Sequence, residues 1–500
     1  MLRDSEPVAL GRRGILLLDA LLKRPGEILT KTELMDAGWQ GSAVEESNLS
    51  VQIALLRKAL GPMPDGAEWV ATIPRIGYRF LGLGLGLEQE GRTAPLQAKP
   101  SLAVLPLTSL SSDPEQEYFA DGLAEDIITM LSKLSGLVVI ARSSSFAYRG
   151  LSIDIRTVAR ELGVRFILAG SVRKSGNRLR IAAQLSDGET GAHLWAESYD
   201  RELADMFTLQ EEVASRIVGA LRIALSPKET AQWPGIASTG TTDLDAYDCF
   251  LRGRAMQRGA TQNSDVFKRT SELFRQAIDH DPNYAAPYAA LAMAMGHAYY
   301  NRWTNDPERA LAEARGLVEE AIRLDPNDPF PHGVAALVST YSKDFERWAS
   351  EVEIALTLNP NFAPALALRG MLNTYSGEPS AAIEDIERAI RLDPLFTQNY
   401  LHHLGVAHLV AGKYETAAAL LRERILLVPE TDMSRAYLAA VLGLLGDDEG
   451  ARRAWSELMA IKPGYSFAEG IGRTPFRNPQ DLNRIRNGLL RAGLPVECSA

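Results

Sequence analysis

The sequence predicts a multidomain α+β protein in three parts: an N-terminal winged helix, a central α/β domain and a C-terminal α-solenoid. Three observations predict this order. A helical pattern over 45–60 runs directly into a hairpin-like pattern over 67–80, strand and helix patterns alternate after Ser101, and prolines recur at near-regular steps beyond 280. At 500 residues the chain has room for three or four domains, because single cores stop growing well below that length.

Charge and composition limit the functions that fit. The net charge of −10 argues against a protein that coats nucleic acid along its length, and residues 1–87 hold ten Lys/Arg against ten Asp/Glu. DNA affinity in that part must come from a local patch and depend on salt. No stretch approaches the roughly 20 apolar residues that span a bilayer, and MLRDSEP lacks the apolar core of a signal peptide. We therefore expect a cytoplasmic protein with no membrane partner.

The N-terminal part contains three expected helices and a hairpin. The first helix is expected over 12–24, and the second begins at a capping box, Thr30 with Glu33, and runs towards Trp39. In the third helix Leu49, Ile53, Leu56 and Leu60 repeat at helical spacing and point inward. The side chains left for solvent or a groove are Ser47, Ser50, Gln52, Ala54, Arg57 and Lys58. A helix followed by the ribbon AEWVATIPRIGYRF is the layout of a winged helix, whose helix enters the DNA major groove.

Three blocks, LLKRPGEILTKTELMDAGWQ, VEESNLSVQIALLRKALG and TIPRIGYRF, resemble the effector domain of OmpR/PhoB-type transcription regulators, and more particularly the CadC- and HilA-like regulators. The resemblance implies that Ser47, Asn48, Val51 and Gln52 face bases or phosphates, that Arg57 and Lys58 contact the DNA backbone, and that Arg75 lies in the wing. It also implies that a loop over 39–46, with Trp39, Gln40, Gly41 and Ser42, touches RNA polymerase.

The chain departs from that family at several positions. Ala54 and Leu55 stand where members often carry basic residues, and Pro74 stands where a wing arginine is common. Only LRDSEPVALG corresponds to the longer first sheet of the family, which fits either a truncated start or a weakened DNA reader. A winged helix used only for protein contacts is the alternative. We divide the chain into a winged helix over 1–82 and a linker over 83–100, since LGLGLGL is followed by a polar, proline-containing stretch rather than the helix of a dinucleotide site.

The central segment, 101–225, alternates strands and helices. SLAVLPL reads as a buried strand, a helix begins near Asp113 and ends near Leu134, and RFILAGSVRKSGNRLRIAAQLSD reads as two strands around a Ser-Gly-Asn turn. The stretches DPEQEYFADGLAEDI, ARSSSFAYRG and GAHLWAESYDREL resemble the TolB-N/FlgO-like domain, which implies a sensory or interaction role.

Catalysis or nucleotide sensing in this segment is a second alternative. Arg142 with Ser143, Ser144 and Ser145 follows a strand, as an anion-binding loop would, and Asp121 or Glu125 has the chemistry of a base. A polar turn and a solvated helix face explain the same residues. His193 has no nucleophile elbow or metal-ligand spacing around it, so we expect no enzyme and no cofactor.

After a linker over 226–242, the third part, 243–495, is repetitive. Prolines stand at 282, 326, 360, 394, 429 and 463, in steps of 44, 34, 34, 35 and 34, and an alanine precedes the first four by five residues. This resembles about six tetratricopeptide repeats, with an insertion around 300–307 in the longest step. The repeats are expected to bind a protein or peptide or to pair with a second copy. The groove residues expected from the repeat spacing are Met371, Tyr375, Asn399, His402, Val406 and Leu409.

Taken together, these features predict a bacterial transcription regulator in signal transduction, whose partners are double-stranded DNA, RNA polymerase and a protein or a second copy. His402, His403 and His408 do not share a helical face, and Cys249 and Cys498 lie far apart, so no metal is expected. The alternatives are an interaction scaffold whose winged helix no longer binds DNA and a ligand or nucleotide sensor that uses the central domain.

Overall fold

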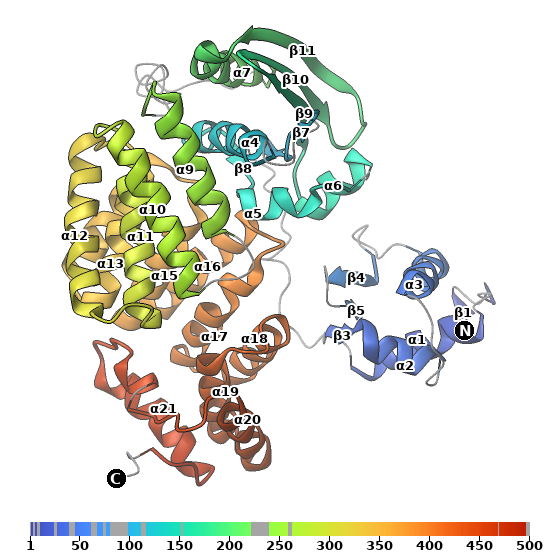
Figure 1. The fold of residues 1–500 in the computed structure, drawn as a ribbon. Coiled ribbons are helices and arrows are strands. Elements are labelled where there is room, and N and C mark those ends of the chain that lie inside the picture. Colours follow the sequence, from blue (N-terminus) through green and yellow to red (C-terminus); the bar gives the residue numbers. More distant parts are fainter. Residues whose placement is uncertain are drawn as a thin grey trace. The chain divides into compact units, whose positions relative to one another are not determined.

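We describe a computed structural model of the chain (Figure 1). Its residues fall into two compact units. One holds 1–91, 412–474 and 482–500, and the other holds 92–411 and 475–481. The structure describes 2–496 except 4–5, 8–10, 25–27, 40–45, 62–67, 74–76, 81–98, 112–116, 152–153, 222–239, 259–262 and 469. The LGLGLGL stretch, the expected helix start at Asp113 and much of both expected linkers therefore lie outside the described residues.

The N-terminal part is a winged helix. Its elements are β1 (Leu2–Arg3), β2 (Glu6–Pro7), α1 (Arg12–Lys23), β3 (Ile28–Thr30), α2 (Lys31–Trp39), α3 (Glu46–Leu60), β4 (Val70–Ile73) and β5 (Gly77–Phe80). The sheet has the order β3-β5-β4, antiparallel throughout. The predicted capping box is confirmed: the Glu33 N–H donates to Thr30 Oγ1 at 3.2 Å, and the Thr30 N–H donates to Glu33 Oε2 at 2.7 Å.

The predicted inward face of α3 is confirmed in the core of this part. Leu49, Ile53 and Leu56 are buried together with Leu17, Leu21 and Leu34 of the first two helices and with Phe80 of the hairpin. Because these leucines and isoleucines share one helical stripe, burying them aims the opposite stripe of α3 outward.

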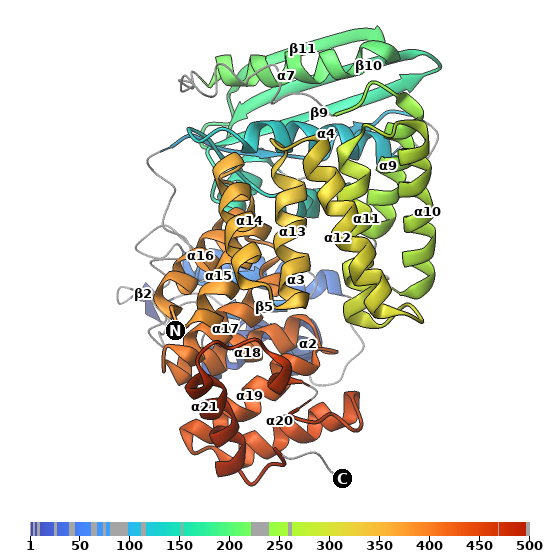
Figure 2. The same cartoon turned by 90° about the vertical axis from the view of Figure 1, so that its left-hand side faces the viewer.

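The central domain is a six-stranded sheet with helices on both faces. Its order is β11-β10-β9-β6-β8, and β7 also pairs with β9. The elements are β6 (Ser101–Val104), β7 (Thr108–Ser109), α4 (Glu117–Ser132), β8 (Val138–Val139), α5 (Arg142–Ser145), α6 (Ile155–Leu162), β9 (Phe166–Ser175), β10 (Arg178–Asp187), β11 (His193–Glu202) and α7 (Met206–Ala220). Side chains alternate across β6: Leu102 and Val104 face the α4 side, and Ala103 faces α6. Figure 2 shows α4 between the sheet and the helical array.

The third part is an array of antiparallel helices, so the predicted fold class is confirmed. In the larger unit the helices are α9 (Leu244–Gln257), α10 (Ser264–His280), α11 (Ala285–Asn301), α12 (Pro307–Leu324), α13 (Pro329–Ser342), α14 (Phe345–Leu358), α15 (Ala363–Ser376), α16 (Pro379–Leu392) and α17 (Leu401–Val410). The other unit holds α18 (Tyr414–Leu427), α19 (Asp432–Leu445), α20 (Asp448–Ile461) and α21 (Pro479–Arg491). The long step of 44 residues is taken up mainly by helix length, since α11 and α12 have 17 and 18 residues where α13 and α14 have 14 each. Tyr300, expected in an inserted stretch, lies inside α11.

The central domain and the first repeats share one hydrophobic core. That core runs from Leu102 of the sheet through α4 and α9 to Val338 of α13. Helices α4 and α9 approach closely at Gly122 of α4, where an added Cβ would lie 2.5 Å from both methyl carbons of Leu251 of α9. The sequence predicts a linker over 226–242 between the central domain and the repeats. In the structure the two parts pack as one unit, because α4 buries apolar side chains against both the sheet and the first repeat helices. Among the described residues we find no helix with the length and hydropathy that crossing a membrane requires.

Candidate nucleic-acid interface

The outward stripe of α3 is the surface that the winged-helix layout presents to DNA. It carries Asn48, Val51, Leu55 and Lys58, spaced at helical intervals and all exposed. Val51 is 57% exposed and Leu55 51%, which makes the stripe apolar in its middle and polar at its ends. A stripe of this kind can offer an amide to a base edge, methyl groups to thymine and one cation to a phosphate.

Arg57 is bound to the wing rather than directed outward. Its Nε donates to the Val70 carbonyl oxygen at 2.9 Å, and Nη2 donates to Thr72 Oγ1 at 2.6 Å. The Glu68 carboxylate lies 2.7 Å from Nε, and the guanidinium lies 6.0 Å from the centre of the Tyr78 ring. The expected contact of Arg57 with the DNA backbone therefore conflicts with this geometry: its donors fix α3 to the hairpin.

The other predicted DNA contacts divide into three groups. Gln52 is half-buried, and Ser50, expected towards solvent or a groove, lies 3.4 Å from the Tyr78 hydroxyl. Ser47 lies in the first turn of α3, and its side chain is not among those the structure describes. Arg75 lies outside the described residues.

The expected polymerase loop overlaps the end of α2. Trp39 is the last residue of that helix and is buried, with the Arg13 guanidinium 5.4 Å from its ring centre. It therefore belongs to the core instead of an exposed loop. Gln40, Gly41 and Ser42 lie outside the described residues.

The serines of α5 hold an anion, and that anion is a carboxylate of the same chain. Asp393, in the turn after α16, accepts hydrogen bonds from the hydroxyls of Ser143 and Ser144, both at 2.6 Å, and from the Tyr400 hydroxyl at 3.0 Å. Burial raises the pKa of Asp393, while these donors lower it. The proposed anion-binding loop is thus filled from within, and Ser145 is buried beside it.

The acidic face of α4, read from the sequence as a base or a solvated face, is neither. Arg142 lies 3.2 Å from Glu125 and 3.6 Å from Asp121. Arg254 of α9 and Arg258, the residue that caps α9, also pair with Glu125. Burial raises the pKa of the neighbouring Asp126 to about 6 and lowers that of Arg142 to about 9. The face is an ion-pair network between the central domain and the first repeat.

Asparagines in the repeat turns complete this contact. The Asn361 side-chain amide donates to the carbonyl oxygens of Ser132 at 2.8 Å and Leu137 at 2.9 Å, and the Asn359 amide donates to Ser132 Oγ at 2.8 Å. The carbonyl of Ser132, at the end of α4, has no partner further along the helix, so Asn361 acts as its cap. Sequence reasoning missed these residues. One signal was available in the sequence. The residue before the turn proline is an aspartate in three repeats, Asp281, Asp325 and Asp393, but an asparagine, Asn359, in a fourth.

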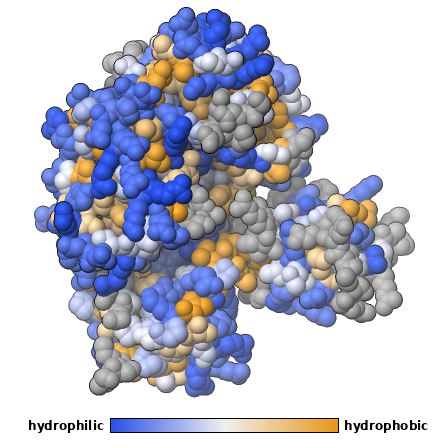
Figure 3. Space-filling view, viewed as in Figure 1, coloured by the Kyte–Doolittle hydropathy of each residue, from blue (hydrophilic) through white to orange (hydrophobic). Residues whose placement is uncertain are grey.

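The predicted protein-binding groove is only partly open. Asn399 is exposed, and Met371 and His402 are half-buried. Tyr375, Val406 and Leu409 are buried, so these three expected groove residues are not open to a partner in this structure. Figure 3 shows hydrophobic residues scattered among hydrophilic ones on the face drawn there.

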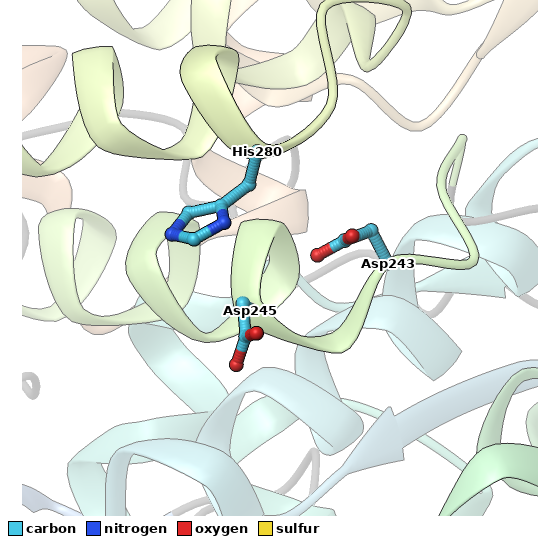
Figure 4. A group of neighbouring side chains, drawn as sticks. All are labelled: Asp243, Asp245 and His280. Carbon is cyan, nitrogen blue, oxygen red and sulfur yellow. The ribbon is translucent and has the colours of Figure 1, made fainter.

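One group of possible metal ligands occurs among the described residues, formed by Asp243, Asp245 and His280 (Figure 4). Each has a helix-terminal role that accounts for it. Asp243 caps α9 by accepting from the Ala246 N–H at 2.8 Å, Asp245 lies in the first turn of α9, and His280 lies in the last turn of α10. Two of the three are exposed, and the group has no further sign of a ligand.

Two segments match families of transcription regulators. Residues 5–80 match the family described as Transcriptional regulatory protein, C terminal, and residues 97–216 match HilA/YgeH-like transcriptional regulator, second domain. In these two segments the chain is similar to transcriptional regulators. More particularly, the chain carries an OmpR/PhoB-type winged helix followed by a HilA-like second domain, which confirms the resemblance drawn from the sequence.

Individual proteins are similar to larger stretches of this chain. A Rhizobium meliloti protein provisionally named adenylate cyclase 3 is 46% identical over 250 residues, covering 50% of this chain and 41% of that protein. Transcriptional regulator HilA of Salmonella typhimurium is 23% identical over 350 residues, covering 69% of this chain and 59% of HilA. The chain thus spans from two fifths to three fifths of these relatives. A solved TPR protein of Thermus thermophilus is similar to 39% of this chain and 98% of its own, with 16% identity and a TM-score of 0.32.

Proposed function

We propose that this chain is a transcription regulator that binds double-stranded DNA through the outward stripe of α3. The observation that carries the proposal is that Asn48, Val51 and Lys58 are exposed on a helix whose other face is anchored in the core and whose end is fixed to a hairpin. A rigid helix beside a wing is the arrangement that winged-helix proteins use to enter the major groove. The match of residues 5–80 to a regulator family supports the same role.

Each side chain of the stripe has a separate contribution. The Asn48 amide can pair with adenine, and the methyl groups of Val51 and Leu55 can pack against thymine methyls. Lys58 is left as the basic side chain of α3 for phosphate, since Nε and Nη2 of Arg57 donate to the hairpin. Because one phosphate contact contributes little, a single copy should bind weakly, and pairing of two copies would raise the avidity.

The test is footprinting of the full chain on the DNA upstream of its own gene, followed by titration of the protected duplex. Asn48→Ala should reduce discrimination between sequences, and Lys58→Ala should weaken binding to all duplexes. Lys23→Ala is the matched control, because Lys23 is an exposed lysine of α1, 71% exposed and paired with Asp19. Wild-type affinity of the first two variants would reject the assignment of α3.

Two finer roles belong to the proposal. Contact with RNA polymerase would involve the stretch between α2 and α3, and an in vitro transcription assay on bound promoter DNA tests it. The repeats would bind a protein or a second copy, which is supported by their helical-repeat architecture. A DNA-binding role would also place the protein in the bacterial cytoplasm.

A second candidate is an interaction scaffold whose winged helix no longer binds DNA. The exposed apolar side chains of Val51 and Leu55 and the engagement of Arg57 favour it. A salt-dependent shift of duplex DNA separates the two candidates, since a protein-binding surface would leave the duplex unbound. We infer no enzymatic or nucleotide-sensing role for the central domain, because Arg142, Ser144 and Glu125 contact other groups of the chain.

A further inference from the structure

Aromatic side chains gather where α14 and α15 meet. Trp348 of α14 lies 6.2 Å from Tyr375 of α15 and 5.9 Å from Phe345, measured between ring centres. We call Phe345, Trp348 and Tyr375 the aromatic site. The Trp348 indole donates to the Leu368 carbonyl at 3.1 Å, which fixes the orientation of its ring.

A short piece of the C-terminal region occupies the aromatic site. The Phe476 ring meets Tyr375 edge to face, with centres 5.1 Å apart and planes at 80°. The Arg477 guanidinium lies 4.9 Å from the centre of the Phe345 ring, and the Arg477 N–H donates to the Tyr375 carbonyl at 2.8 Å. Three different features of the dipeptide are therefore recognised: its ring, its cation and a backbone N–H.

The surroundings explain why this dipeptide is recognised. Tyr375 lies in the last turn of α15, where carbonyl groups lack partners further along the helix, so its oxygen is available to an incoming N–H. Asp344, Glu346 and Glu378 are exposed beside these residues in the sequence, and the carboxyl end of α15 adds negative potential. A cation over the face of Phe345 is favoured for the same electrostatic reason.

The occupying piece belongs to a different compact unit from the segments on either side of it. Residues 475–481 group with 92–411, whereas 412–474 on one side and 482–500 on the other group with the second compact unit. Phe476 is only half-buried, and Arg477 is exposed. A segment that contributes one ring, one cation and one N–H is chemically equivalent to a peptide from another protein.

We propose that the aromatic site binds an extended peptide of a partner protein that carries an aromatic residue followed by a basic one, and that Phe476 and Arg477 are its internal competitor. The inference rests on the proposed protein-binding role of the repeats and is independent of DNA binding. Because the internal segment is tethered, it competes at an effective concentration on the order of millimolar. To displace the internal segment, a partner peptide must therefore bind strongly or carry several copies of the motif.

The experiment uses the full chain and a fluorescent peptide TPFRNP, which copies residues 474–479. Anisotropy titrations compare the wild type with the Phe476→Ala, Arg477→Ala double variant. The double variant should bind the peptide about tenfold more tightly or better, because its own competitor is gone. Adding Phe345→Ala should remove most of that gain, and a peptide with Phe replaced by Ala should bind neither chain.

Controls keep the outcomes distinct. Leu490→Ala, at an exposed residue of α21, should behave as wild type. Arg477→Glu alters only an exposed side chain, so it tests the idea even if the double variant fails to fold. Equal peptide affinity in wild type and folded variants would overturn the proposal, as would a wild-type dimer that Phe476→Ala dissociates, since a second copy would then be the occupant. Duplex DNA binding of the same variants, measured in parallel, tests the function of α3 separately.

Discussion

The hydroxyl of Ser144 donates to the carboxylate of Asp393 at 2.6 Å, across 249 residues of chain. Ser144 lies in α5, the short helix that follows β8, and Asp393 belongs to the repeat turn after α16. Both residues are buried, so the bond replaces the water that each would otherwise bind. The serine-rich stretch that resembles an anion site in the sequence therefore links the central domain to the repeat domain.

Asp393→Ala should lower the free energy of unfolding by about 2–3 kcal/mol, because it leaves buried hydroxyls of Ser144 and its neighbours without an acceptor. Urea unfolding of the full chain measures the effect. Asp279→Ala, at an exposed carboxylate of α10, is the control. A variant at Asp393 as stable as the control would show that the joint contributes nothing.

Asp126 should make stability depend on pH. Its folded pKa of about 6 lies above the roughly 3.9 of an unfolded aspartate, so the native state binds this proton more tightly. This contribution to stability is present below pH 4 and is lost as the pH rises through 6. Asp126→Asn should therefore gain stability relative to wild type between pH 4 and 7, by up to about 3 kcal/mol at roughly 1.4 kcal/mol per pKa unit. If the free energy of unfolding of wild type and of Asp126→Asn changed with pH in the same way, the raised pKa of Asp126 would be contradicted.

Helix ends in the repeats show where backbone strain lies. Arg302 and Lys343 have φ of 55° at the carboxyl caps of α11 and α13, whereas Gly377 takes the same role after α15. Non-glycine residues in this region are disfavoured by roughly 1 kcal/mol. Lys343→Gly should raise the thermal midpoint slightly, and Gly377→Ala should lower stability by about 1 kcal/mol. Calorimetry of both variants decides this, and a stabilising Gly377→Ala would contradict it.

The sequence predicted the features that are written in local patterns. The capping box of Thr30 and Glu33, the inward stripe of α3 and the helical repeat follow from spacing, and all of them are present. Contacts between distant segments were not predictable in this way. Nothing local to Asp393 or Asn361 distinguishes a solvated turn from a buried joint, because the partner lies more than 200 residues away.

The candidate site shows the same division. Exposure of Lys58 followed from the helical pattern, and the outward position of Asn48 was implied by the family resemblance. The engagement of Arg57 depends on where the hairpin returns. Trp39 was expected in a loop by resemblance and lies buried instead, since an indole at the end of α2 is drawn into the core.

Substitutions at the neighbouring residues Arg57 and Lys58 should have different effects: the first should lower the stability of the winged helix, and the second should weaken DNA binding. Arg57→Ala removes bonds to Val70 and Thr72 and should destabilise the winged helix by about 1–2 kcal/mol. Lys58→Ala removes an exposed side chain and should leave stability unchanged. Hydrogen exchange of amides 46–60 in the full chain measures the stability of α3 in each variant. Faster exchange in the Lys58 variant but not in the Arg57 variant would contradict this assignment.

The most direct test of DNA binding through α3 is the salt dependence of duplex affinity for the full chain and for Lys58→Ala. Neutralising a phosphate releases about 0.9 counterion, so the variant should bind more weakly and its slope of log affinity against log salt should be shallower by about one unit. The same duplex and Lys23→Ala serve as reference. Equal affinity and slope in a Lys58 variant whose α3 amides exchange as in wild type would contradict the account.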